Sequence, residues 1–269
     1  RHYLSVSWKD DKNRTGIMAR RKVGKMKDLY LNLVKRCVMG YVSSDDDDKD
    51  VEARDDGRYS SLLSQNAHTM IGKKRLNDLQ FQIETVLREG VSGDVAECGV
   101  WRGGASIFMR AILKAYGSDK NVWVIDSFKG LHAPDYDKFP GEQLNPRVPL
   151  WEQEWLRISS DVVKKNFERF ELLDGQVKFL EGWVEQTLPT APIDSLSVLR
   201  VDVDMYEPTM AVLENLYPKL SVGGFCDLDD YPIMTATVNA VNDYRSRMGI
   251  TEEIVVPEGY SGAYWRKTQ

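Results

Sequence analysis

Acidic residues follow two apolar segments in the second half of the chain. Asp202 and Asp204 end the segment LRVDVD, and Asp229 and Asp230 end the segment CDLDD. If these segments are neighbouring parallel strands, they lie about 4.8 Å apart, and Asp202, Asp229 and Asp230 can converge at one edge of the sheet. Converging carboxylates repel one another unless a cation lies between them, and their oxygens suit Mg²⁺ or Mn²⁺. We therefore predict a divalent-metal site, with helix capping as the alternative role of these residues.

A turn rich in glycine follows an earlier apolar segment, in the sequence ECGVWRGG at residues 97–104. Its glycines allow a tight turn and a close approach of the backbone to a ligand, and a helix that begins after them would direct its N-terminus at an anionic group. The next apolar segment ends in Asp126, at a spacing typical of an acid that accepts hydrogen bonds from ribose hydroxyls. These features predict a nucleoside-containing cofactor, either a nicotinamide cofactor or S-adenosylmethionine. A turn that simply needs small residues is the alternative.

The composition disfavours several other classes of protein. The 269 residues carry a net charge of −5, so we expect no nucleic-acid partner. No apolar run has the length of a membrane span and no apolar signal segment is visible, so we expect no membrane partner. Three cysteines in no zinc-binding pattern suit a reducing cytoplasm, which is the expected location. His68 and His132 have no metal-like or triad-like spacing, although either could line a site.

The first part of the chain is predicted to form an extension. Residues 1–27 are polar, carry no period and are predicted to be a flexible arm, in which Met18 could be the natural start. Leu29, Leu33 and Cys37, with their neighbours Tyr30, Val34 and Val38, then recur at helical spacing until Gly40. Residues 43–58 are rich in Asp and are predicted to be a linker. Residues 1–58 would thus be an arm, a helix and an acidic linker, and residues 59–269 the main domain.

Strand-like and helix-like segments alternate through the main domain. Predicted strands are 95–98, 122–125, 177–180, 196–203 and 225–228, with two closing strands near 253–256 and 262–266 that flank Gly259. Predicted helices are 73–88, 103–116, 157–170, 210–220 and 235–248. This alternation predicts a doubly wound α/β fold with a mostly parallel sheet and an antiparallel edge at its C-terminus. Residues 128–150, in a long loop after Asp126, are predicted to form a mobile lid over the substrate.

Several separate and ordered motifs resemble one family. They are DLYLNLVKRC, AHTMIGKKRL, GDVAECGVWRGGASIFMRAIL, VWVIDSFKGL, VKFLEGWVEQTLP, LRVDVDMYEPTMAVLENLYPKLSVGGF and DLDDY. Over residues 28–269 the chain is similar to the macrocin-type sugar O-methyltransferases of antibiotic biosynthesis. The resemblance implies a class I, Rossmann-like methyltransferase that uses S-adenosylmethionine and Mg²⁺. Its substrate would be a small-molecule glycoside, methylated on the hydroxyl of a rhamnosyl-type deoxysugar. A homo-oligomer is also expected, with the N-terminal helix and arm as a candidate interface.

The resemblance also assigns roles to individual residues. Those it places on the cofactor are Thr69, Met70, Glu97, Gly99, Arg102, Gly103, Asp126, Ser127, Gly182, Trp183 and Asp202. Among these, Asp126 and Ser127 would lie at the ribose and Gly182 and Trp183 near the adenine. Asp202, Asp229 and Asp230 would bind the metal, and Asp204 would be the general base. No function is carried over to the acidic stretch 43–58, and Cys98 is a local departure from the family's pattern.

Other enzymes also use an Asp-x-Asp pair such as Asp202-x-Asp204. A phosphotransfer enzyme or phosphatase would use it as nucleophile and acid, but usually on the first strand of its domain. A metal-dependent glycosyltransferase would use it to hold a sugar-nucleotide diphosphate, which leaves the glycine turn and Asp126 unexplained. A cofactor-binding scaffold without activity would not need the intact set of four acids.

Overall fold

A six-stranded sheet forms the centre of the computed structural model, which describes residues 9–42, 66–139, 149–258 and 261–269, with side chains from residue 24 onward. The strands are β1 Asp94–Cys98, β2 Val122–Asp126, β3 Val177–Glu181, β4 Leu196–Val201, β5 Leu220–Leu228 and β6 Ala263–Arg266. Their order across the sheet is β3-β2-β1-β4-β5-β6. The first five are parallel and β6 pairs antiparallel with β5, which confirms the predicted doubly wound sheet and its antiparallel edge.

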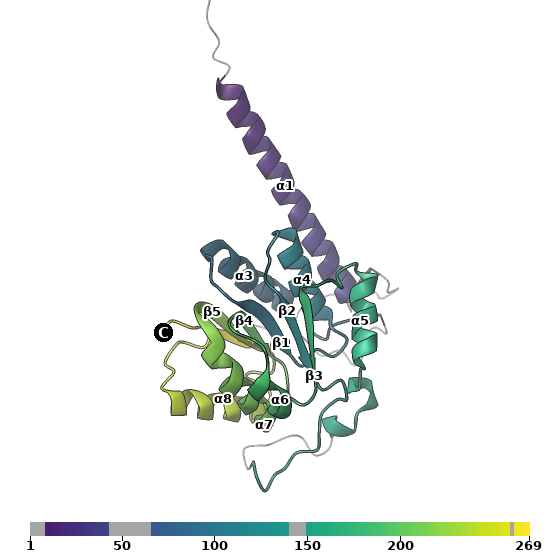
Figure 1. Cartoon of the computed structure of the whole chain (residues 1–269), viewed down its shortest axis with the longest axis vertical. Coiled ribbons are helices and arrows are strands. Elements are labelled where there is room, and N and C mark those ends of the chain that lie inside the picture. The colour runs from purple at the N-terminus through teal and green to yellow at the C-terminus, as the bar shows by residue number, and fades with distance from the viewer. Residues whose placement is uncertain (1–8, 43–65, 140–148, 259–260) are drawn as a thin grey trace, which may run out of the picture.

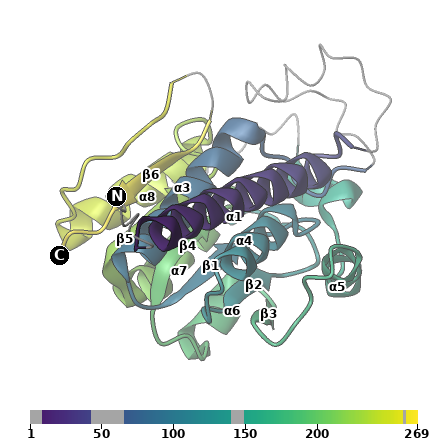
Figure 2. The same ribbon diagram turned by 90° about the horizontal axis from the view of Figure 1, so that it is seen from above.

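Helices cover both faces of the sheet (Figures 1 and 2). On one face lie α1 Lys9–Val38, α3 Lys73–Glu89, α4 Gly104–Ala115 and α5 Ser160–Arg169. On the other lie α6 Val184–Thr187, α7 Tyr206–Leu216 and α8 Thr235–Met248. Successive residues of a strand point to opposite faces, so each strand contributes to two cores. In β2, for example, Val122 and Val124 pack in the first core and Trp123 and Ile125 in the second. This burial on both faces explains the continuous apolar runs.

The N-terminal helix is longer than predicted, and only part of its predicted apolar set is buried. The flexible arm predicted for residues 1–27 is wrong from Lys9 onward, because α1 is continuous from there to Val38. Residues 31, 34 and 38 are buried in the first core, whereas Leu29 and Leu33 are 63% and 53% exposed. Both sets have helical spacing, so periodicity alone could not tell the packed stripe from the exposed one. Figure 1 shows α1 extending well beyond the rest of the fold, with its C-terminal half beside α4.

Several other boundaries differ from the prediction. Helix α7 begins at Tyr206 instead of residue 210, and β5 begins at Leu220 instead of 225, after a short 3₁₀ helix Tyr217–Lys219. The closing strand predicted near 253–256 is only an isolated bridge between Val255 and Tyr264. The acidic stretch 43–58, Gly259 and residues 140–148 of the predicted lid lie outside the described residues. Within the part of the chain that is described, no helix is long and apolar enough to cross a membrane.

Candidate active site

The strand order creates a crevice at the centre of the sheet. β1 and β4 are neighbours, although the chain passes through β2 and β3 between them, and the helices that follow them, α4 and α7, cover opposite faces. Ligands of open α/β sheets bind at such a switch point, beyond the carboxyl ends of the strands. Gly99, the first residue after β1, has φ +84°, and a Cβ placed on it would lie 1.6 Å from the backbone oxygen of Asp202. Glycine is therefore required where the two strand ends meet.

A cavity opens at this crevice, with about 690 Å³ of space including its open mouth. Its wall is built from the segments that follow β1, β2, β3 and β4, together with Met70 from the segment before α3. The predicted site residues on the wall are Met70, Gly99, Asp126, Ser127, Trp183, Asp202 and Asp204. The structure therefore brings residues from distant parts of the sequence to one space.

Asp126 lies on this wall with both carboxylate oxygens held by the backbone. Val100 N–H donates to Oδ2 at 2.7 Å and Phe128 N–H donates to Oδ1 at 2.6 Å. Burial raises the pKa of Asp126, and these backbone donors act against that rise. A carboxylate oxygen has two acceptor sites, so the carboxylate keeps acceptor capacity toward the cavity. Gly182, the first residue after β3, donates its N–H to the backbone oxygen of Asp126 at 2.9 Å.

The residues around the start of α4 are hydrogen-bonded to the segment that precedes α3. Gly104 N–H donates to the backbone oxygen of His68 at 2.8 Å, and a Cβ on Gly104 would lie 2.5 Å from that oxygen. Arg102 donates to the backbone oxygen of Ala67 at 2.9 Å, so the segment before α3 is tied to the glycine turn. Gly103 precedes α4 with φ +84°, and Thr69 accepts a hydrogen bond from Ile71 N–H. Arg102, Gly103, Thr69 and Gly182 are absent from the cavity wall, and their cofactor role stays a prediction.

Three carboxylates converge beside the cavity, as the strand-end argument predicted. Oxygen atoms of Asp202, Asp229 and Asp230 lie within 4.8 Å of one another. Asp230 is 3% exposed, and its Oδ2 has no hydrogen-bond partner among the described residues. Burial and the neighbouring Asp202 raise the pKa of Asp230 to about 7. A divalent cation would supply the partner that Oδ2 lacks and would relieve the repulsion, so the donor set fits such an ion.

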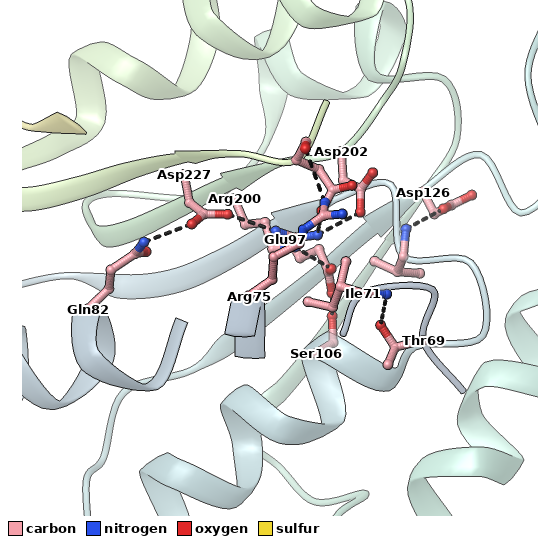
Figure 3. A network of polar contacts seen from close by, with 12 residues as sticks. Thr69, Ile71, Arg75, Gln82, Glu97, Ser106, Asp126, Arg200, Asp202 and Asp227 are labelled. Atoms are coloured by element: carbon pink, nitrogen blue, oxygen red, sulfur yellow. Dashed lines mark hydrogen bonds and ion pairs between the residues drawn. The ribbon is translucent and has the colours of Figure 1, made fainter. Parts of the chain in front are cut away.

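Arg200 lies at the centre of this acidic cluster, and its role was not predicted from the sequence. Figure 3 shows its guanidinium surrounded by carboxylates. It donates to Glu97 at 3.0 Å, to Asp202 at 2.9 Å and to Asp227 at 2.7 Å, and it also pairs with Asp229. These carboxylates raise the pKa of Arg200 against the effect of its burial. An arginine in the apolar run of a central strand is the sequence signal for such a buried ion-pair network.

Glu97 belongs to this network and is absent from the cavity wall. It is 2% exposed, and its two oxygens accept hydrogen bonds from Ser106 and Arg200. Burial raises its pKa to about 7 in spite of the Arg200 charge. The structure therefore shows Glu97 as a partner of Arg200, and its predicted contact with a cofactor stays a prediction.

Asp204 lines the cavity next to Asp202, although residues two apart on a regular strand would share one direction. Both lie beyond the last residue of β4, and Asp204 has φ +59°, in the left-handed region. The backbone N–H of Asp204 is hydrogen-bonded to the carboxylate of Asp230, and its backbone oxygen accepts from Thr237 at 3.2 Å. The turn thus ties Asp204 to a candidate metal ligand and places the residue on the cavity wall.

Aromatic residues and a histidine complete the wall. Trp101, His132 and Glu185 line the cavity. Of these three, the sequence indicated only His132 as a residue that could line a site. Nε2 of His132 lies 3.3 Å from Glu185 and Nδ1 lies 3.0 Å from the backbone oxygen of Ala133. These acceptors raise the pKa of His132 to about 9, so the ring is a cation with both nitrogens engaged. It is poorly suited to accept a proton as a general base.

Comparison with known proteins agrees with this arrangement. Residues 5–267 match the family model described as macrocin-O-methyltransferase (TylF). The chain is 46% identical over 257 residues to mycinamicin III 3''-O-methyltransferase of Micromonospora griseorubida, which covers 90% of this chain and 97% of the relative. It is 45% identical over 252 residues to 8-demethyl-8-(2,3-dimethoxy-alpha-L-rhamnosyl)-tetracenomycin-C 4'-O-methyltransferase of Streptomyces olivaceus, covering 90% and 94%. The solved O-methyltransferase NovP is 42% identical, with a TM-score of 0.82 over 90% of this chain and 100% of NovP. This chain is therefore an O-methyltransferase that belongs to the macrocin-O-methyltransferase family.

Proposed function

We propose that this chain transfers the methyl group of S-adenosylmethionine to a sugar hydroxyl of a glycosylated natural product, with Mg²⁺ as its metal ion. One observation carries the proposal. The acid suited to a ribose, Asp126, and the acidic pair Asp202 and Asp204 line the same cavity. A cofactor held at one side of that cavity would therefore face an acceptor held at the other. Such alignment is the main requirement for transfer of an already activated methyl group.

The cofactor is assigned to the part of the cavity between β1 and β2. Asp126 keeps acceptor capacity there, and Trp183 and Met70 provide apolar surface on the same wall. An adenosine has both a hydroxyl-bearing ribose and a flat apolar ring, and these residues suit the two parts. The runner-up functions, a glycosyltransferase and a phosphotransfer enzyme, would leave Asp126 and the adjoining glycine turn without a role.

The metal is assigned to Asp202, Asp229 and Asp230. The unpartnered Oδ2 of Asp230 supports this assignment, as does the close approach of the three carboxylates. The chemistry that Mg²⁺ supplies when bound is a lower pKa and a fixed orientation of the acceptor hydroxyl. We propose that the carboxylate of Asp204 accepts the hydroxyl proton. Asp204 lies on the cavity wall, and the hydrogen bond of its backbone to Asp230 holds its position.

The class of acceptor is taken from the relatives. A third relative, demethyldecarbamoylnovobiocin O-methyltransferase of Streptomyces niveus, is 41% identical over 252 residues. All three relatives are named for the compound that they methylate, and the tetracenomycin enzyme is named for a rhamnosyl compound. We propose a rhamnosyl-type deoxysugar on a natural product, in antibiotic biosynthesis, as the acceptor here. The segment after β2 would cover it. Lys138 pairs with Glu207 at 3.0 Å and Phe139 packs on Tyr206, so the described part of this segment lies against α7.

We also propose a homo-oligomer, in which the exposed residues Leu29 and Leu33 of α1 contribute to the interface. Light scattering of the wild type and of a Leu33→Glu variant tests this, because a charge in an apolar interface shifts the protein toward monomer. A monomeric wild type would contradict the assignment without affecting the proposed chemistry.

The decisive experiment is a methyl-transfer assay with S-adenosylmethionine, Mg²⁺ and a panel of rhamnosyl glycosides, read by mass spectrometry. The expected product is heavier by one methylene group, and its formation is expected to stop when a chelator removes the metal. Titration calorimetry with S-adenosylmethionine, with and without Mg²⁺, separates the rivals. Absence of S-adenosylmethionine binding would overturn the proposed cofactor, because neither rival mechanism uses it.

A further inference from the structure

Asp229 is held by a second arginine, which comes from a distant helix. Arg75 of α3 is 8% exposed, pairs with the Asp229 carboxylate and donates to the Asp229 backbone oxygen at 3.1 Å. Its other terminal nitrogen donates to Ser261 Oγ at 3.0 Å. One guanidinium therefore links three segments: α3, the residue after β5 and the residues before β6. The planar fork of an arginine can make these contacts together.

The two arginines contact particular oxygens of Asp229 and Asp202. Arg75 and Arg200 both contact Oδ1 of Asp229, and Arg200 also takes Oδ2 of Asp202. The two guanidiniums thus fix the orientation of two of the three candidate metal ligands. Hydrogen bonds from outside a metal site that fix its carboxylate ligands commonly control its affinity.

The charges of the cluster leave room for such an ion. Four carboxylates (Glu97, Asp202, Asp227 and Asp229) pair with the guanidinium of Arg75 or Arg200, and a fifth, Asp230, lies beside Asp202 and Asp229. The formal negative charge exceeds the positive charge, so the arginines order the acids without neutralising them. Charge balance alone does not explain why Asp230 Oδ2 is buried without a hydrogen-bond partner among the described residues.

We propose that Arg75, held by Ser261, is a positioning residue for the divalent-metal site, and that α3 and the C-terminal segment thereby set its metal affinity. The inference rests on the proposed function, because it concerns the metal assigned there. It predicts that loss of the Arg75 charge weakens metal binding, whereas Coulomb's law alone predicts stronger binding. Removal of a positive charge next to a cation site strengthens binding by Coulomb attraction, whereas loss of the fixed ligand orientation weakens it.

The test is calorimetric titration of Mn²⁺ into the wild type and into the variants Arg75→Gln, Arg75→Lys and Ser261→Ala. We expect Arg75→Gln to bind Mn²⁺ about 10–100-fold more weakly, the usual range for loss of a partner that orients a metal ligand. The Mn²⁺ affinity of Arg75→Lys is expected to lie between those of Arg75→Gln and the wild type, because one ammonium group cannot make all three contacts. Ser261→Ala is expected to weaken binding less than Arg75→Gln.

The matched control is Arg110→Gln. Arg110 of α4 is also buried, at 4% exposure, and its guanidinium pairs with Asp174 at 2.6 Å, in the turn before β3 at the opposite edge of the sheet. This variant loses the same charge and an ion pair of a buried arginine, but far from the acidic cluster, so its Mn²⁺ affinity is expected to equal that of the wild type. Binding of S-adenosylmethionine without metal is expected to stay unchanged in every variant.

The outcomes separate this inference from the proposed function. If the wild type shows no saturable Mn²⁺ binding, the proposed metal dependence is wrong and the inference fails with it. If the wild type binds Mn²⁺ and Arg75→Gln binds it equally well or more tightly, only the inference is overturned. If Arg75→Gln does not fold, the other two variants decide, and wild-type affinity in both overturns the inference.

Discussion

Replacement of Arg200 by Met should destabilise the protein more than the loss of any surface ion pair. The side chain is 2% exposed and contacts the carboxylates of Glu97, Asp202, Asp227 and Asp229. Met has a similar length but no charge, so the variant would leave four acids without their shared partner. Removal of one partner from a buried ion pair typically costs about 3–5 kcal/mol. For a chain of this size that corresponds to a fall in Tm of about 6–20 °C.

The same reasoning predicts a rescue that a simple packing defect would not show. A divalent cation that binds the folded cluster raises the stability of the folded state, and it should do so more in the variant, where the acids lack Arg200. We therefore expect Mg²⁺ to raise the Tm of Arg200→Met by more than that of the wild type. The measurement is thermal unfolding by circular dichroism over a range of Mg²⁺ concentrations.

Arg110→Met is the control for this prediction, because the Asp174 partner of Arg110 is 36% exposed and water can replace the lost contact. We expect a smaller fall in Tm and no additional response to Mg²⁺ in that variant. An Arg200→Met protein that melts at the wild-type temperature would refute the view that these contacts hold the acids together. A large fall that Mg²⁺ leaves unchanged would refute the link between the network and the metal.

Three further predictions concern single residues of the site. Asp204→Asn should keep cofactor and metal binding but lose turnover by about 10²–10⁴-fold. Extra Mg²⁺ should partly restore the turnover of Asp202→Asn. If extra Mg²⁺ restores only Asp204→Asn, the two roles are reversed. Asp126→Ala should weaken S-adenosylmethionine binding by about 1.5–3 kcal/mol in calorimetry, because a charged hydrogen-bond acceptor is lost, and an unchanged affinity would defeat the assignment. Glu185→Gln should lower the pKa of His132 from about 9 toward its ordinary value, as followed by NMR titration, since Glu185 is the main cause of the raised pKa; a pKa that stays near 9 would contradict this.

The sheet could be predicted because its strands are buried on both faces and therefore have a simple pattern. Errors arose where a strand contains turn-like residues. The predicted strand 225–228 left out Gly223 and Gly224, yet both lie inside β5, where its pairing with β4 shifts register. Gly224 is needed there because a Cβ would lie 2.7 Å from the backbone oxygen of Ser197. A bulge and a turn use the same residue types, so the sequence alone does not separate them.

The acids of the site could be predicted for a similar reason. Asp202, Asp229 and Asp230 follow strands, and neighbouring parallel strands bring their ends together whatever the other details of the fold. The arginine partners of these acids could not be predicted in this way. Arg75 lies on a helix, 154 residues before its partner Asp229, and no periodicity connects the two positions. Contacts of this kind depend on tertiary packing and become visible only in the structure.

The position of β4 explains why one cavity can serve two reactants. β4 lies between β1, which precedes the glycine turn, and β5, which precedes Asp229 and Asp230. The residues after β4 therefore touch both sides: Asp202 N–H donates to the backbone oxygen of Cys98 at 2.9 Å, and Asp229 N–H donates to that of Val201 at 3.0 Å. A displacement of this strand end would alter the cofactor side and the acidic side together. The close contact at Gly99 thus fixes the distance between them, on which transfer between two bound reactants depends.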